Sequence, residues 1–110
     1  MCEATDVTGL SRVLLDFYAS PLSRSLLDDI LAPLDALGPE RAAIAVRTLV
    51  AYLGHRTSLA RAGEALNLHP SAVNYRVRRI EQSLGLDLTD PDVRFAVELA
   101  CRVRLIATRR

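Results

Sequence analysis

Residues 58–88 decide the fold, and they read SLARAGEALNLHPSAVNYRVRRIEQSLGLDL. Ser58 suits the first position of a short helix, Leu59–Leu66, because its hydroxyl can accept a hydrogen bond from a free N–H group of the first turn. Asn67 follows, and asparagine tolerates the left-handed conformation that ends a helix in a tight turn. Leu68 then closes the turn with an apolar side chain.

A second helix is predicted directly after this turn, over Pro70–Leu84. Proline favours the first position of a helix, and Gly85 provides its C-terminal stop. Ala62 and Gly63 are small enough to let the two helices approach closely. Two helices joined by three or four residues form a helix-turn-helix.

The second helix has two different faces when it is projected at about 100° per residue. Its apolar stripe is predicted to be buried and comprises Val73, Val77, Ile80 and Leu84. The rest of the surface is polar and basic, has no acidic residue before Glu81, and includes Ser71, Ala72, Asn74, Tyr75, Arg76, Arg78, Arg79 and Gln82. Such a face fits the major groove of DNA, where the first turns reach base edges and arginines bind phosphates or guanine. The alternative is a solvated face whose arginines serve only solubility.

The charges are unevenly distributed along the 110 residues. The net charge is +1, from 14 basic and 13 acidic residues, and every basic residue is an arginine. Residues 1–40 hold two arginines and seven acidic residues, a balance of −5, whereas residues 41–86 hold seven arginines and two glutamates, a balance of +5. A basic middle of this kind favours an anionic partner, and arginine can contact phosphate or guanine in a bidentate manner.

The whole chain is predicted to be all-α, a single small domain of about five to six helices, because no segment shows the alternation of a half-buried strand. Ser20 is expected to cap the second helix, and Pro33 to end or kink it near Leu31. The expected helices outside residues 58–88 are Leu10–Tyr18, residues 21–31, Glu40–Leu53 and Pro91–Ala107. We expect residues 1–38 to be an N-terminal helical linker or dimerisation segment and residues 39–110 to be the helix-turn-helix domain.

The last predicted helix is apolar over a broad arc. Asp90 is expected to cap it, because Pro91 follows at the first helical position. Part of the arc should pack on the helix-turn-helix, and the rest is expected to form a homodimer face, since helix-turn-helix proteins commonly pair to read two half-sites. The acidic pair Asp28 and Asp29 is the alternative dimer contact.

Other chemistry finds little support in the sequence. Cys2 and Cys101 form neither a CxxC pair nor a Cys/His cluster, which fits a reducing cytoplasm and gives no zinc or disulfide site. His69 is expected to cap the second helix or to approach a phosphate. No phosphate-binding, metalloprotease or nucleophile-elbow motif is present, so neither an enzyme nor a cofactor or small-molecule ligand is predicted. The apolar run Ala42–Leu53 is far shorter than the roughly 20 residues of a membrane span, and the start of the chain lacks the pattern of a secretory signal.

The part of the sequence that contains the helix-turn-helix resembles a known protein family. Six stretches carry the resemblance: TLVAYL (48–53), SLARAGEAL (58–66), LHP (68–70), YRVRRIE (75–81), LGLDL (84–88) and DPDVRFA (90–96). They are similar to the C-terminal helix-turn-helix domain of purine-catabolism (PucR) and sugar-diacid type transcriptional regulators, over about Leu49–Leu105. Tyr18–Leu34 is also similar, more weakly, to the linker that precedes this domain.

The resemblance implies sequence-specific binding to double-stranded DNA, with Pro70–Leu84 as the recognition helix. The sequence departs from the family in two ways. Ser71 and Ala72 replace an Asn-Thr pair that is frequent in the family. No sensory region fits in the chain, so a fragment or a regulator without its sensor is expected. The expected DNA-binding residues are Ser58, His69, Ser71, Ala72, Asn74, Tyr75, Arg76, Arg78 and Arg79. A small all-α protein-interaction module is the alternative function.

Overall fold

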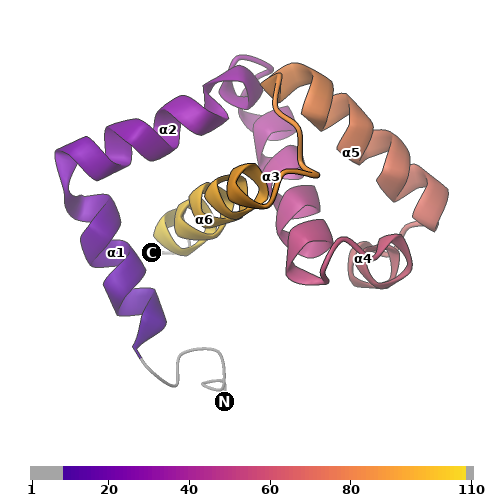
Figure 1. Cartoon of the computed structure of the whole chain (residues 1–110), viewed down its shortest axis with the longest axis horizontal. Helices are drawn as coiled ribbons and strands as arrows, with labels where there is room; N and C mark the ends of the chain where they lie inside the picture. The colour runs from indigo at the N-terminus through magenta and orange to yellow at the C-terminus, as the bar shows by residue number, and fades with distance from the viewer. Residues whose placement is uncertain (1–8, 109–110) are drawn as a thin grey trace.

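The computed structural model describes residues 9–108 and contains six α-helices, with no strand among these residues (Figure 1). The predicted all-α class is therefore confirmed; Cys2 lies outside the described residues. The helices are α1 (Leu10–Ala19), α2 (Pro21–Asp35), α3 (Pro39–Gly54), α4 (Leu59–Leu66), α5 (Pro70–Leu84) and α6 (Pro91–Thr108). None of these helices is both long and apolar enough to cross a membrane.

Helix α2 departs from the sequence prediction at both ends. It continues through Pro33 to Asp35, so the expected end near Leu31 is wrong, whereas the alternative of a kink at Pro33 stays a prediction. Leu31 and Leu34 are 1% and 0% exposed, and their burial on either side of Pro33 offsets the single backbone hydrogen bond that proline removes. At the other end Ser20 stands at the N-cap position, but its side chain makes no capping hydrogen bond.

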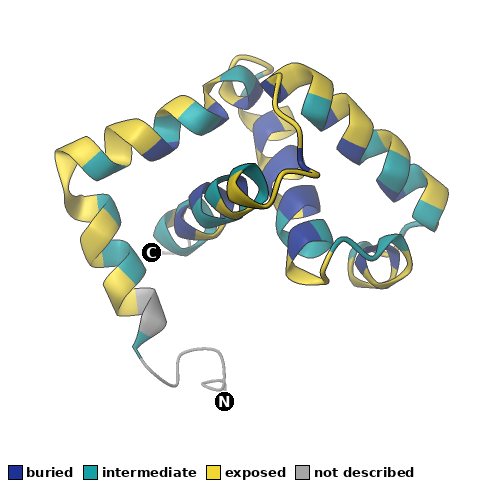
Figure 2. Cartoon of the chain, in the orientation of Figure 1, coloured by how far each residue is buried: buried dark blue, intermediate teal, exposed yellow. Residues whose placement is uncertain are grey.

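The hydrophobic core lies around α3, which contacts α2, α4, α5 and α6. Figure 2 shows buried residues on the sides of the helices that face one another. The largest fully buried aliphatic side chains come from four helices: Leu31, Leu34, Val46, Leu49, Val73, Val97 and Val103. Residues 1–38 and 39–110 both contribute to this core, and the division of the chain at residue 38 stays a prediction.

Helix α6 packs against α1, α2 and α3 and makes no close contact with α4 or α5. It therefore supports the helix-turn-helix through α3, and the expectation of direct packing on the two motif helices is wrong. Its buried residues include Cys101, and this burial raises the pKa of the Cys101 thiol to about 12. Phe95, in contrast, stays 68% exposed.

A charge network ties α6 to the acidic N-terminal helices. The guanidinium of Arg104 lies 2.6 Å from Asp35 Oδ1 and 3.1 Å from Asp28 Oδ1. The hydroxyl of Tyr18 donates to the same Asp28 oxygen at 2.9 Å. Burial, and then this hydrogen bond, raise the pKa of Tyr18. Asp28 is thus bound within the chain, which weakens the alternative that it forms a dimer contact.

Candidate nucleic-acid interface

The turn between α4 and α5 has the local geometry that its sequence predicts. Ser58 Oγ accepts a hydrogen bond from the Arg61 N–H at 3.1 Å and caps α4. Asn67 ends the helix in the left-handed region, with φ 59° and ψ 46°. The Leu68 N–H then donates to the Gly63 carbonyl at 2.8 Å. Because the Ser58 hydroxyl already holds the helix end, its observed role is structural.

The two helices of the motif meet at Ala62 and Gly63, both of which are buried. A Cβ atom added at Gly63 would lie 2.5 Å from the Leu68 carbonyl oxygen and 3.5 Å from the Pro70 nitrogen. Both contacts are with backbone, which cannot rotate away as a side chain can. The sequence predicts a small residue here, and the structure shows that α4 approaches the start of α5 so closely that glycine is required.

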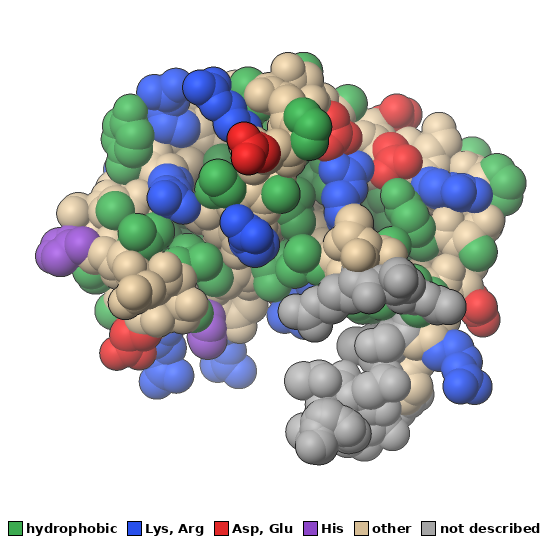
Figure 3. All heavy atoms as spheres, turned by 180° about the vertical axis from the view of Figure 1, so that it is seen from behind, with side chains coloured by type: hydrophobic (Ala, Val, Ile, Leu, Met, Phe, Trp, Pro, Cys, Tyr) green, Lys and Arg blue, Asp and Glu red, His purple; other side chains and the backbone are tan. Residues whose placement is uncertain are grey.

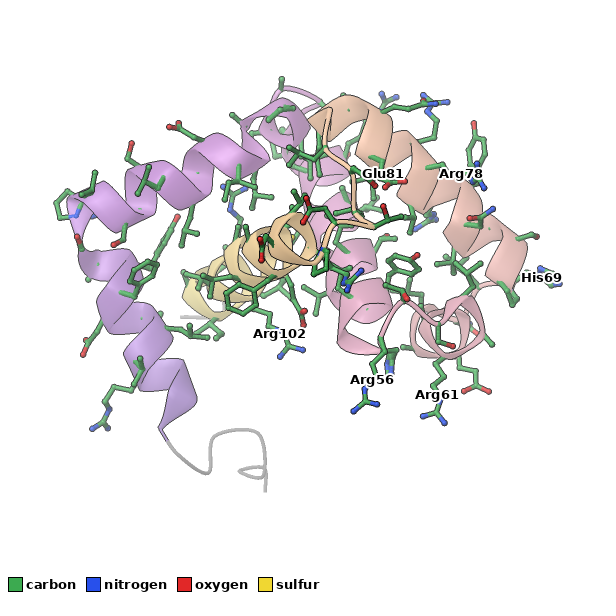
Figure 4. The ribbon with its side chains drawn as sticks, viewed as in Figure 1. Arg56, Arg61, His69, Arg78, Glu81 and Arg102 are labelled. Carbon is green, nitrogen blue, oxygen red and sulfur yellow. The ribbon has the colours of Figure 1, made fainter. Side chains whose placement is uncertain are left out.

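His69 caps helix α5. Its Nδ1 accepts from the Ser71 N–H at 3.1 Å and lies 2.8 Å from Ser71 Oγ. An imidazole that accepts at Nδ1 carries its proton at Nε2, so Nε2 remains a donor. Figure 4 shows His69 at the N-terminal end of α5, extending away from the body of the protein. The capping role predicted for His69 is confirmed.

The buried stripe of α5 consists of the four residues that helical projection predicts: Val73, Val77, Ile80 and Leu84. Ser71, Tyr75, Arg78, Arg79 and Gln82 are exposed, and Ala72, Asn74 and Arg76 are partly buried on the flanks. Tyr75 has 61% of its surface exposed. Helix α5 thus offers a continuous polar surface beginning at its first turn.

Two pairs of side chains on α5 hold each other across one turn. The Arg79 Nη1 donates to the Tyr75 hydroxyl at 3.0 Å, and its guanidinium lies 5.8 Å from the centre of the Tyr75 ring. The Arg78 Nε donates to Asn74 Oδ1 at 3.4 Å. Each guanidinium has five N–H donors, so these contacts orient both arginines and leave most of their donors for a partner.

The one acidic residue of α5 is used inside the protein. Glu81 Oε2 accepts from the Leu88 N–H at 3.0 Å, and Figure 4 shows Glu81 on the side of α5 that faces this following loop. The loop begins at Gly85, which has a φ of 66°, and ends at Asp90, whose Oδ1 caps α6 by accepting from the Asp92 N–H at 2.9 Å. Glu81 is therefore directed toward the loop and away from the arginines of the outer face.

Positive charge consequently collects on the helix-turn-helix side of the molecule. Among the described residues, no ion pair involves Arg76, Arg78 or Arg79. In Figure 3, seen from behind, most side chains of Arg and both of His gather on one half of the face, whereas most acidic side chains lie on the other. The sequence asymmetry thus becomes a spatial asymmetry.

The sequence does not indicate that two further arginines lie beside helix α5. Arg41 and Arg47 lie on α3 and line clefts that α3 forms with Arg76 of α5. The available signal was the spacing of Arg41, Ile44 and Thr48 (i, i+3, i+7), which places them on one helix face. Only the packing of α3 against α5 shows that this face adjoins α5.

The model of the PucR C-terminal helix-turn-helix domain matches residues 45–103, more than half of the chain. The chain belongs to this family. The PucR-domain match runs from the middle of α3 through most of α6 and includes the whole of the motif described above. The resemblance predicted from residues 48–96 is confirmed.

One curated relative of this PucR-family chain is described as an uncharacterized protein in the pkwA 5′ region of Thermomonospora curvata. The two sequences are 43% identical over 53 residues, which make up 48% of this chain and 29% of the relative. The matched part thus spans less than a third of the relative's length. No solved structure matches the chain.

Proposed function

We propose that the chain is the sequence-specific DNA-binding part of a transcriptional regulator, with double-stranded DNA as its partner. The observation that carries the proposal is the outer surface of α5, where Arg76, Arg78 and Arg79 lack an ion-pair partner among the described residues and the one acid, Glu81, is bound to the following loop. Membership of the PucR helix-turn-helix family supports the same function.

The proposed binding mode places α5 in the major groove. The early positions Ser71, Ala72, Asn74 and Tyr75 face base edges, as the first turns of a recognition helix do. The three arginines bind phosphates or guanine, and His69 donates from Nε2 to a phosphate. Ser58 contacts the DNA backbone from the N-cap position of α4, where free N–H groups of the first helical turn face the phosphates. Phosphate contacts then supply most of the affinity, and base contacts supply the selectivity.

The proposed activity is binding without catalysis, cofactor or small-molecule ligand on this segment, and the proposed location is the cytoplasm. The matched part covers 29% of the curated relative. The proposal covers the DNA-binding part alone, either as a segment of a longer regulator or as a regulator that acts without a sensory region.

The decisive experiment selects bound sequences from a random duplex pool and then compares variants by gel shift. Arg78→Ala and Arg79→Ala are each expected to weaken binding to the selected duplex and to lower the salt dependence by about 0.9 in the slope of log K against log salt, because each removes about one phosphate contact. Arg102→Ala is the matched control, since Arg102 is exposed on α6 and pairs with Glu98 at 2.9 Å.

Two results would contradict DNA binding. One is recovery of no preferred sequence together with failure of the protein to be retained on heparin or calf-thymus DNA at low salt. The other is binding that ignores both arginine substitutions and salt. Either result would favour the alternative of an all-α protein-interaction module whose arginines form a solvated face.

We also propose that the chain forms a homodimer, which would let two recognition helices read half-sites about one DNA turn apart. The support is a group of large apolar side chains on α1, α2 and α6 that stay exposed: Val13, Phe17, Leu22, Leu26 and Phe95. Light scattering at high micromolar concentration should give twice the 12.1 kDa of the monomer. A mass that stays at one chain would remove the dimer from the proposal.

A further inference from the structure

The seam between α3 and α5 contains two adjoining clefts beside the recognition helix. The larger has a volume of about 420 Å³ and is lined by residues that include Arg41, Ile44, Tyr75, Arg76 and Arg79. The smaller, of about 270 Å³, shares Ile44, Thr48 and Arg76 with the first and adds Arg47. Because they share these residues, the clefts form one continuous track along the side of α5.

This track is strongly and uniformly positive. Four arginines line it, Arg41, Arg47, Arg76 and Arg79, and no acidic residue does. None of the four forms an ion pair among residues 9–108. Their mutual repulsion favours a bound anion, and a concave surface lined by one sign of charge concentrates the field.

The lining of the track combines apolar side chains with hydrogen-bond donors. Ile44 lines both clefts and is 41% exposed, and the Thr48 hydroxyl is already used, because it donates to the Ile44 carbonyl at 2.8 Å. The other polar groups are the four guanidinium groups, the Ser83 hydroxyl and the Tyr75 hydroxyl, which accepts from Arg79. A chain of anionic groups separated by apolar spacers matches this pattern, and the phosphates and deoxyriboses of a DNA strand form such a chain.

We propose that this cleft, the α3–α5 track, binds the phosphodiester backbone of the duplex whose major groove α5 enters, with Arg41 and Arg47 as phosphate ligands. The inference rests on the proposed function and extends the interface from the helix-turn-helix to α3. Contacts to phosphate fix the position of a protein on DNA without reading its sequence. Helix α3 therefore sets how α5 sits in the groove, and the outer face of α5 reads the bases.

The test measures the affinity of the full chain for two fluorescent duplexes, one selected from a random pool and one of random sequence, from 50 to 400 mM salt. Arg41→Gln with Arg47→Gln should lower the salt slope by about 1.8, because each lost phosphate contact removes about 0.9. At about 0.1 M salt this corresponds to roughly an eightfold loss of affinity for each contact. The loss should be equal for both duplexes, so the ratio of specific to non-specific affinity stays constant.

The double substitution Arg12→Gln with Arg24→Gln is the matched control, since it removes the same charge from exposed positions on α1 and α2. Circular dichroism verifies that each variant is folded. An equal loss of affinity in this control would overturn the track, because the effect would then be one of net charge. The proposal would also be overturned if the variant Arg41→Gln with Arg47→Gln kept the affinity and the salt slope of the unchanged protein. A loss confined to the selected duplex would overturn the phosphate role, because it would show base reading. If the unchanged protein binds neither duplex, the proposed function itself fails, and this outcome is distinct from the others.

Discussion

Arginine side chains have different environments in two regions of this molecule. In the region formed by α1, α2 and α6, Arg104 is enclosed by Asp28 and Asp35, and its side chain is only 20% exposed. Along α3 and α5, arginines such as Arg76 and Arg78 have no acidic partner among the described residues. The first region uses charge to join helices that are distant in sequence, whereas the second leaves its charge without an acidic partner among the described residues.

This difference shows what holds each region together. The N-terminal helices and α6 combine apolar packing with an ion-pair network that spans 76 residues of sequence, from Asp28 to Arg104. The helix-turn-helix depends on close packing at Gly63, a left-handed Asn67 and the caps at Ser58 and His69. A surface kept free for binding cannot satisfy its own charges, so its stability must come from the buried side and the turns.

The largest effect on stability is expected at Gly63, where α4 packs against the start of α5. Gly63→Ala forces a Cβ to 2.5 Å from the Leu68 carbonyl oxygen and should lower the free energy of unfolding by about 2–3 kcal/mol. The affinity for the DNA duplex should fall together with the stability, because α5 must shift. Urea denaturation and gel shift measure the two effects.

Gly54→Ala is the control for this substitution. An added Cβ would lie 3.3 Å from Arg102 Nη2, the mobile end of an exposed side chain, so stability should stay unchanged or rise by up to about 1 kcal/mol through the better helix propensity of alanine. Equal losses for the two substitutions would mean that the approach of α4 to α5 has no special dependence on Gly63.

A smaller effect separates the two kinds of arginine directly. Arg104→Met should cost about 1–2 kcal/mol of unfolding free energy, because it leaves Asp28 and Asp35 without their shared partner, and the loss should shrink in high salt, since all three groups are partly exposed. Duplex affinity should remain close to that of the unchanged protein. Urea denaturation at two salt concentrations, with gel shift alongside, provides the measurements.

The matched substitution in the other region is Arg78→Gln with Arg79→Gln. It should change the unfolding free energy by less than about 0.5 kcal/mol, as expected of exposed positions, while weakening duplex binding. If this pair destabilised the fold and Arg104→Met did not, the contrast between internal and external arginines would be wrong.

Much of the interface was predictable because its signals are local. Ser58, Asn67 and Gly85 act on backbone groups a few residues away, so the bounds of α4 and α5 follow from their neighbours in sequence. Helical periodicity likewise separates Val73 and Val77 from the polar face. The bounds predicted for both helices and their buried stripe are confirmed for these reasons.

Other features escaped prediction because they depend on residues far apart in the chain. Pro33 signals a helix end locally, yet the burial of Leu31 and Leu34 by other helices overrides that signal. Arg41 and Arg47 look like ordinary solvated residues of α3 until α5 packs beside them.

The sequence by itself determined the all-α class, the helix-turn-helix and its family, because caps, turns and helical periods act over one or two turns of backbone. Only the tertiary structure decided where the charges act. It enclosed Arg104 between two carboxylates of α2 and brought arginines of α3 alongside those of α5. The physical reason is distance: a charge pair or a charged cleft exists only after packing has brought together groups that the chain holds far apart.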